Sequence, residues 1–181
     1  MVSRLQKKYK EEIVPQMMEK FKIANMMAVP RLEKIVISMG VGKSIGDPKI
    51  MESAVQDLTI ISGQKPIITK SKEAISNFKL KEKTPIGCVV TLRRVRMFEF
   101  LDRLVNVSLP RIRDFNGMPR ISFDKQGNYS MGITDQSIFP EIDTGRILHM
   151  QGMNITFVFN KGPKEQTLEL LSFLGMPFIK K

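Results

Sequence analysis

The spacing of apolar residues is the feature that most constrains the fold, because it changes along the chain between a helical and a strand-like period. Apolar residues recur at four-residue steps near the N-terminus, as in an amphipathic helix, and Pro15 is placed to kink that helix or displace its start. Other segments alternate apolar and polar side chains, as half-buried strands do. Strands are expected over residues 34–39, 66–70, 86–93 and 153–159. Helices are expected over residues 3–21, 48–62 and 97–108, and after Pro163.

Residues 124–128 predict a hairpin turn between two short strands. The resulting order is helix, strand, helix, strands, helix, hairpin, strand, helix. It is neither a strict βαβ alternation nor an all-β run. It predicts a single α+β domain over residues 1–181, with a mostly antiparallel sheet and helices packed on one face. The opposite face of such a sheet stays open for a partner.

Positive charge is the strongest compositional signal. Lys and Arg total 29 against 18 Asp and Glu, which gives a net charge of +11. Residues 65–96 hold nine basic and two acidic side chains, a net of +7. This excess favours a polyanionic partner, above all nucleic acid and less often an anionic membrane. A solvated surface that serves solubility is the alternative.

Other compositional features exclude several classes of protein. No apolar run approaches the roughly 20 residues that cross a bilayer, and the N-terminus does not resemble a secretory signal. The single cysteine, Cys88, excludes an internal disulfide. We therefore expect a soluble, cytoplasmic protein that does not act on a membrane.

Two patterns suggest enzymes, and both are weak. Gly42-Lys43-Ser44 after a strand suggests a phosphate loop and hence a nucleotide hydrolase, but that motif requires a glycine where Ile37 stands. His149, the only histidine, lies 61 residues from Cys88, which indicates neither a zinc site nor a nucleophile pair. The sequence predicts a protein that is not an enzyme and needs no metal or cofactor.

The segment 71–84 is a lysine-rich connection without a clear period. Long irregular connections in compact domains are usually functional or disordered. Four lysines surround Phe78: Lys72, Lys79, Lys81 and Lys83. The lysines could meet phosphates while the ring stacks on a base. Equally, Phe78 could pack into the core and leave the lysines in water.

The polar side of the strand 86–93 is a second candidate surface. Thr91 and Arg93 point the same way, and Arg94 and Arg96 extend the positive charge. Ser38 joins them if the strand 34–39 lies nearby. Such a face suits the sugar–phosphate backbone and 2′-hydroxyls of folded RNA. A solvent-facing sheet without a partner would show the same pattern.

Seven short segments carry a resemblance to known proteins: 38–42 (SMGVG), 61–66 (ISGQKP), 85–93 (PIGCVVTLR), 109–115 (LPRIRDF), 127–132 (GNYSMG), 138–142 (IFPEI) and 177–178 (PF). In these segments the chain resembles the bacterial form of the universal fifth protein of the large ribosomal subunit. The resemblance runs in order from about residue 5 to residue 179.

The resemblance implies an α+β protein that binds 5S rRNA and helps attach it in the central protuberance. It implies that the loop 71–84 contacts peptidyl-site tRNA, and that the protein joins the thirteenth small-subunit protein in an inter-subunit bridge. It makes 23S rRNA and neighbouring large-subunit proteins further expected partners. The residues implied for 5S rRNA contact are Ser38, Gln64, Thr91 and Arg93, with Arg94 beside them.

Two of these positions depart from the family pattern. Ser38 stands where the family usually has asparagine, so it lacks the amide fork of that side chain. Arg94 replaces a common glycine and adds a positive charge.

Overall fold

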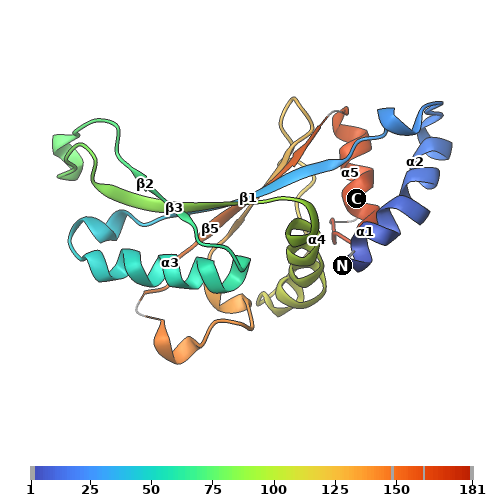
Figure 1. The fold of residues 1–181 in the computed structure, drawn as a ribbon. Coiled ribbons are helices and arrows are strands. Elements are labelled where there is room, and N and C mark those ends of the chain that lie inside the picture. Colours follow the sequence, from blue (N-terminus) through green and yellow to red (C-terminus); the bar gives the residue numbers. More distant parts are fainter. Residues whose placement is uncertain (1–2, 148, 161, 180–181) are drawn as a thin grey trace. The chain divides into compact units, whose positions relative to one another are not determined.

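The computed structural model describes residues 3–147, 149–160 and 162–179 and contains one five-stranded antiparallel sheet (Figure 1). The strand order is β2-β3-β1-β5-β4. The strands are β1 Leu32–Gly40, β2 Ile67–Lys70, β3 Pro85–Leu92, β4 Tyr129–Ile133 and β5 Met153–Phe159. The α-helices are α1 Arg4–Lys8, α2 Val14–Phe21, α3 Pro48–Ser62, α4 Arg94–Arg103 and α5 Lys164–Phe173. The predicted α+β class and antiparallel sheet are confirmed.

The contacts within the chain define two compact units. Unit 1 comprises Met1–Ile35, Leu92–Met131 and Thr156–Lys181, and unit 2 comprises Val36–Thr91 and Gly132–Ile155.

Local sequence signals define both ends of helix α3 in unit 2. The Asp47 carboxylate accepts a hydrogen bond from the Lys49 backbone N–H at 2.9 Å, and Pro48 occupies the first turn. Gly63 ends the helix with a φ of 65°, which glycine adopts without a steric cost. The predicted helix over residues 48–62 is confirmed.

The strands of unit 2 bury one face under α3 (Figure 1). The side chains of Ile37, Met39, Cys88 and Val90 are at most 2% exposed. The Cys88 thiol lies 4.0 Å from the carbonyl oxygen of Ala54 in α3. The alternate residues of β1 and β3 are half-buried, so this unit has the open sheet face that the alternation predicts.

Helix α1, a π-helical segment (Tyr9–Ile13) and α2 follow one another without a break in unit 1. Pro15 lacks an N–H, and its ring would collide with the carbonyl of Glu11 in a regular α-helix. A widened π turn in front of the proline is a common way to absorb that conflict. The sequence predicts a kink or a displaced start at Pro15, whereas in the structure the helical run begins at Arg4 and widens to a π segment before the proline.

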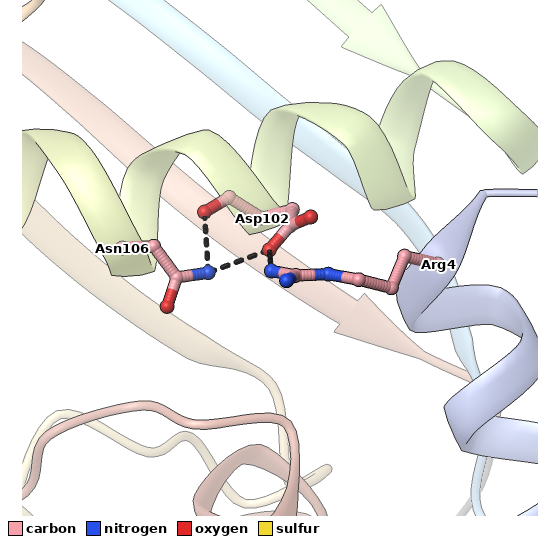
Figure 2. Close-up of polar contacts among 3 residues, drawn as sticks. All are labelled: Arg4, Asp102 and Asn106. Atoms are coloured by element: carbon pink, nitrogen blue, oxygen red, sulfur yellow. Dashed lines mark hydrogen bonds and ion pairs between the residues drawn. The ribbon is translucent and has the colours of Figure 1, made fainter.

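Ion pairs link the helices of unit 1. Figure 2 shows Arg4 of α1 against Asp102 of α4, with an Nη2–Oδ1 distance of 2.7 Å. Asn106 donates to the same carboxylate from one turn further along. Lys20 of α2 pairs with Glu169 of α5 at 2.7 Å. These pairs fix which helix faces meet, although exposed ion pairs add little stability.

The hairpin predicted around residues 124–128 is only partly present. Asp124 accepts hydrogen bonds from the backbone N–H groups of Gln126 and Asn128, so the turn forms. However, only one strand, β4, follows it, and the preceding segment contributes a single bridge from Phe123 to Tyr129. Pro119 cannot donate to a ladder, and its carbonyl accepts the Tyr129 hydroxyl instead.

Gly87 allows β3 to approach β1 closely. A Cβ at this position would lie 2.6 Å from the carbonyl oxygen of Met39 and 3.0 Å from Thr69 Oγ1. The Met39 carbonyl oxygen belongs to the backbone and cannot rotate away. Any side chain at residue 87 must therefore push two paired strands apart.

We predict that Gly87→Ala lowers the free energy of unfolding by about 1–3 kcal/mol, the usual cost of overpacking. Urea denaturation followed by circular dichroism measures this loss. Gly46→Ala is the control, because a Cβ there meets its nearest atom, the Lys43 carbonyl oxygen, only at 4.0 Å. Equal stability of the two variants would contradict this account of β3.

Candidate RNA-binding site

Three of the predicted contact residues belong to unit 2 and form what we call the sheet patch: Ser38, Gln64 and Thr91. Ser38 and Thr91 are half-buried positions on β1 and β3, which are neighbouring strands. Gln64 follows the glycine that ends α3, and its Nε2 lies 3.5 Å from the Thr91 carbonyl oxygen. The structure thus brings Gln64 to Thr91.

The hydroxyls of the sheet patch remain available to a ligand. Within the part of the chain that the structure describes, neither the Ser38 nor the Thr91 hydroxyl makes a hydrogen bond. Backbone carbonyl groups next to the patch are already hydrogen-bonded within the protein. The Ser62 hydroxyl donates to the carbonyl oxygens of Leu58 and Gln64 at 2.6 and 2.8 Å. The patch can therefore donate and accept hydrogen bonds without breaking the fold.

The other two predicted residues, Arg93 and Arg94, belong to unit 1 and form what we call the arginine patch. Both side chains are exposed at the point where β3 leads into α4. Arg93 Nη1 lies 3.2 Å from Glu33 Oε1, and both side chains are about half exposed. An ion pair of this kind contributes at most about 1 kcal/mol, so a phosphate can replace the carboxylate.

Arg94 has a left-handed backbone, with a φ of 53°. This conformation costs a residue with a Cβ roughly 1–2 kcal/mol, and glycine avoids the cost. The structure thereby explains why glycine suits this position. It also moves the start of α4 to Arg94, ahead of the predicted start at residue 97.

The loop 71–84 in unit 2 forms a hairpin that projects beyond β2 and β3 (Figure 1). The Ser71 hydroxyl donates to the Lys81 carbonyl oxygen at 2.6 Å and accepts from the Thr84 N–H at 3.1 Å. Ile75 and Leu80 form a bridge below a short turn at Ser76–Phe78. The loop is therefore held at its base and at its tip.

Phe78 is 70% exposed at the tip of this hairpin. The alternative in which the ring packs into the core is wrong, because the Ile75–Leu80 bridge turns the tip outward. The four predicted lysines are exposed as well: Lys72, Lys79, Lys81 and Lys83. An aromatic ring among solvated cations can stack on a base while the cations meet phosphates.

Two further cations, which the sequence did not predict as contact residues, lie with the arginine patch. Lys10 and Arg31 line the same hollow as Arg93 and Arg94, although they come from the π segment and from the residue before β1. Their only signal in the sequence is their charge. Their grouping depends on how the N-terminal helix packs against α4.

The geometry excludes the phosphate-loop interpretation. Ser44 is buried, and its hydroxyl donates to the carbonyl oxygens of Val41 and Pro85 at 2.6 and 3.1 Å. It is therefore committed to the turn after β1 and is not placed to hold a magnesium ion. Burial, together with the negative charge of Asp57, raises the pKa of Cys88 to about 11, so the thiol stays neutral and unreactive.

Within the described residues, no group of three or more His, Cys, Asp or Glu side chains lies close enough together to hold a metal ion. Among the described helices, none combines the length and the apolar character of a membrane span.

Comparisons with known proteins agree with the geometry. Residues 25–81 match the family described as ribosomal protein L5, and residues 85–178 match the ribosomal L5P family C-terminus. Large ribosomal subunit protein uL5 of Clostridium tetani is 55% identical over 178 residues, 98% of this chain and 99% of that protein. The protein of the same name from Prosthecochloris aestuarii is 54% identical over 180 residues, 99% of this chain and 92% of that protein.

The fold, the open basic surfaces and these matches define a structural protein of the large ribosomal subunit that is not an enzyme. Such a protein associates with ribosomal RNA and works within the ribosome, in the bacterial cytoplasm. The chain belongs to the uL5 family, the bacterial fifth-protein family that its motifs resemble.

We predict that Arg94→Gly raises the free energy of unfolding by about 1 kcal/mol, because glycine relieves the left-handed backbone strain. Glu99→Gly is the control. Residue 99 is an exposed interior position of α4, where glycine should instead cost about 1 kcal/mol. Urea titration of both variants tests the pair, and a loss of stability in Arg94→Gly would refute the strain at this position.

Proposed function

We propose that this protein binds 5S rRNA through the sheet patch and the arginine patch, and helps attach that RNA in the central protuberance. The free hydroxyls of Ser38 and Thr91, in unit 2 with the Gln64 amide, carry the proposal. Hydroxyl and amide groups match the 2′-hydroxyls of RNA, and arginine forks match its phosphates. Membership in the uL5 family supports the same assignment.

Ser38 contributes less to this contact than the usual asparagine would. Its hydroxyl offers one donor and can accept, but it is shorter than an amide and cannot form two parallel hydrogen bonds. We assign the larger share of the affinity to Thr91, Gln64 and the arginine patch. Arg94 adds a charge that the family glycine lacks, at the expense of backbone strain.

The second part of the proposal concerns the loop 71–84, which contacts peptidyl-site tRNA with Phe78 and its lysines. Its support is the exposed ring and the hydrogen bonds that hold the hairpin in shape. The same protein contacts 23S rRNA, neighbouring large-subunit proteins and the thirteenth small-subunit protein in an inter-subunit bridge. The family resemblance supports these last contacts.

We predict that Arg93→Ala weakens 5S rRNA binding by about 1–3 kcal/mol, through loss of a charge-assisted hydrogen bond. Filter binding or fluorescence anisotropy at several salt concentrations measures the affinity. Binding by the unaltered protein should fall with salt at a slope of about 0.7–0.9 per phosphate neutralised, and the variant should show a smaller slope.

Arg113→Ala is the matched control, because Arg113 is an arginine of the same unit with a 96% exposed side chain outside the arginine patch. It should change 5S rRNA affinity much less. Unchanged affinity in a folded Arg93→Ala protein would remove Arg93 from the site. A flat salt titration of the unaltered protein would count against RNA binding itself.

We predict that deletion of residues 74–82 leaves 5S rRNA affinity intact and weakens tRNA contact in assembled ribosomes. Phe78→Ala removes only the ring and should weaken that contact by about 1–3 kcal/mol, the usual worth of a stacked base. Chemical probing of tRNA in reconstituted ribosomes gives the readout. Loss of 5S rRNA binding on deletion would contradict the division between loop and patches.

A further inference from the structure

A hollow of about 580 Å³ in unit 1 extends the arginine patch toward the N-terminal helix. Its volume falls within the range of roughly 300–1,000 Å³ that is typical of small-ligand pockets. The rim carries four cations, Lys10, Arg31, Arg93 and Arg94, and one carboxylate, Glu33. Glu33 already pairs with Arg93, so the rim keeps a large positive excess.

Aromatic side chains form part of the wall of this hollow. The ring centroids of Tyr9 and Phe98 lie 6.4 Å apart, and their planes are inclined by 36°. The Tyr9 hydroxyl donates to the carbonyl oxygen of Pro30 at 3.1 Å, which fixes the ring. Burial raises the pKa of the Tyr9 hydroxyl, and the positive charge of Arg31 offsets part of that rise. The hydroxyl therefore stays neutral and keeps this hydrogen bond.

Three of these residues, Tyr9, Lys10 and Arg31, also line a second hollow of about 370 Å³. There, Met26 and Met27 are 60% and 73% exposed. Flexible apolar methionines adapt to flat surfaces, including bases. The two hollows therefore flank Lys10 and Arg31, which we call the basic ridge. An RNA strand can pass over this ridge.

We propose that the larger hollow holds one unpaired nucleotide of an RNA strand, with its phosphate on the cationic rim and its base against the Tyr9 ring. This inference rests on the proposed 5S rRNA binding and adds Tyr9, Lys10 and Arg31 to the site. The bases of a duplex are stacked and paired, so none of them can enter a concave pocket. An extruded nucleotide offers both a charge and a flat π-face, and these are what the rim and wall recognise.

The test compares two double variants that lose the same charge from the same unit. Lys10→Ala with Arg31→Ala removes the ridge cations, and Lys7→Ala with Lys8→Ala removes exposed cations of α1 that do not line the hollow. All four side chains are exposed, so both proteins should fold, as circular dichroism will check. We expect the ridge variant to lose roughly tenfold in 5S rRNA affinity and the control to lose clearly less.

Acylation of RNA 2′-hydroxyls gives a second readout at single-nucleotide resolution. We expect one unpaired nucleotide to be protected by the unaltered protein and the control, and to become reactive with the ridge variant. Equal affinity losses in both double variants, or unchanged reactivity of every unpaired nucleotide on binding of the unaltered protein, would overturn the inference. So would tight, saturable binding of free adenosine monophosphate, which would assign the hollow to a small ligand.

The two proposals fail in different ways. If Gln64→Ala weakens 5S rRNA binding while the ridge variant binds normally, the hollow is not an RNA site and the sheet patch stands. Normal RNA binding by a ridge variant that is lost from large subunits would assign the hollow to an acidic protein partner. If Gln64→Ala and Arg93→Ala are both silent, the proposed function itself fails.

Discussion

Burial of one sheet face under α3 is the interaction on which the surfaces of unit 2 depend. Ile37, Met39, Cys88 and Val90 leave water together, and burial of apolar area is the main favourable contribution to folding. Because strand residues alternate, this burial fixes the register, and a slip by one residue would expose the whole apolar set. Gly87 allows the two strands to lie close enough for that packing.

The polar face of β1 and β3 follows from the burial of their apolar face. Once alternate residues of β1 and β3 face α3, Ser38 and Thr91 must face the other way, and no described neighbour occupies their hydroxyls. The same strand then runs into Arg93 and Arg94, where the backbone turns left-handed before α4 begins. Strained residues persist where the surrounding structure holds them, and they gather at functional sites. Arg94 is strained in this way, which is consistent with the RNA contact that we propose for it.

The features that the sequence predicted well are those with local causes. Asp47, Pro48 and Gly63 define α3 without help from the rest of the chain, and alternation alone identifies β3. Placements that depend on tertiary packing were not predictable. From the sequence alone, Phe78 suited the core and the solvent equally, whereas in the structure the ring is exposed at the tip of the hairpin. The segment before Asp124 was expected to be a strand but contributes a single bridge, from Phe123 to Tyr129. Lys10 and Arg31 join the arginine patch only through the packing of the N-terminal helix.

The Arg93–Glu33 pair shows how the cationic rim can be selective. In the free protein, Glu33 holds the Arg93 guanidinium in place, but the half-exposed pair is worth at most about 1 kcal/mol. In the proposed site, a phosphate held by Arg31 and Lys10 as well as by Arg93 gains from three cations, which favours exchange of the carboxylate for that phosphate. The displaced carboxylate would repel a phosphate that reaches Arg93 alone. Under this proposal, Glu33 penalises polyanions that contact only Arg93 and favours a phosphate within the hollow.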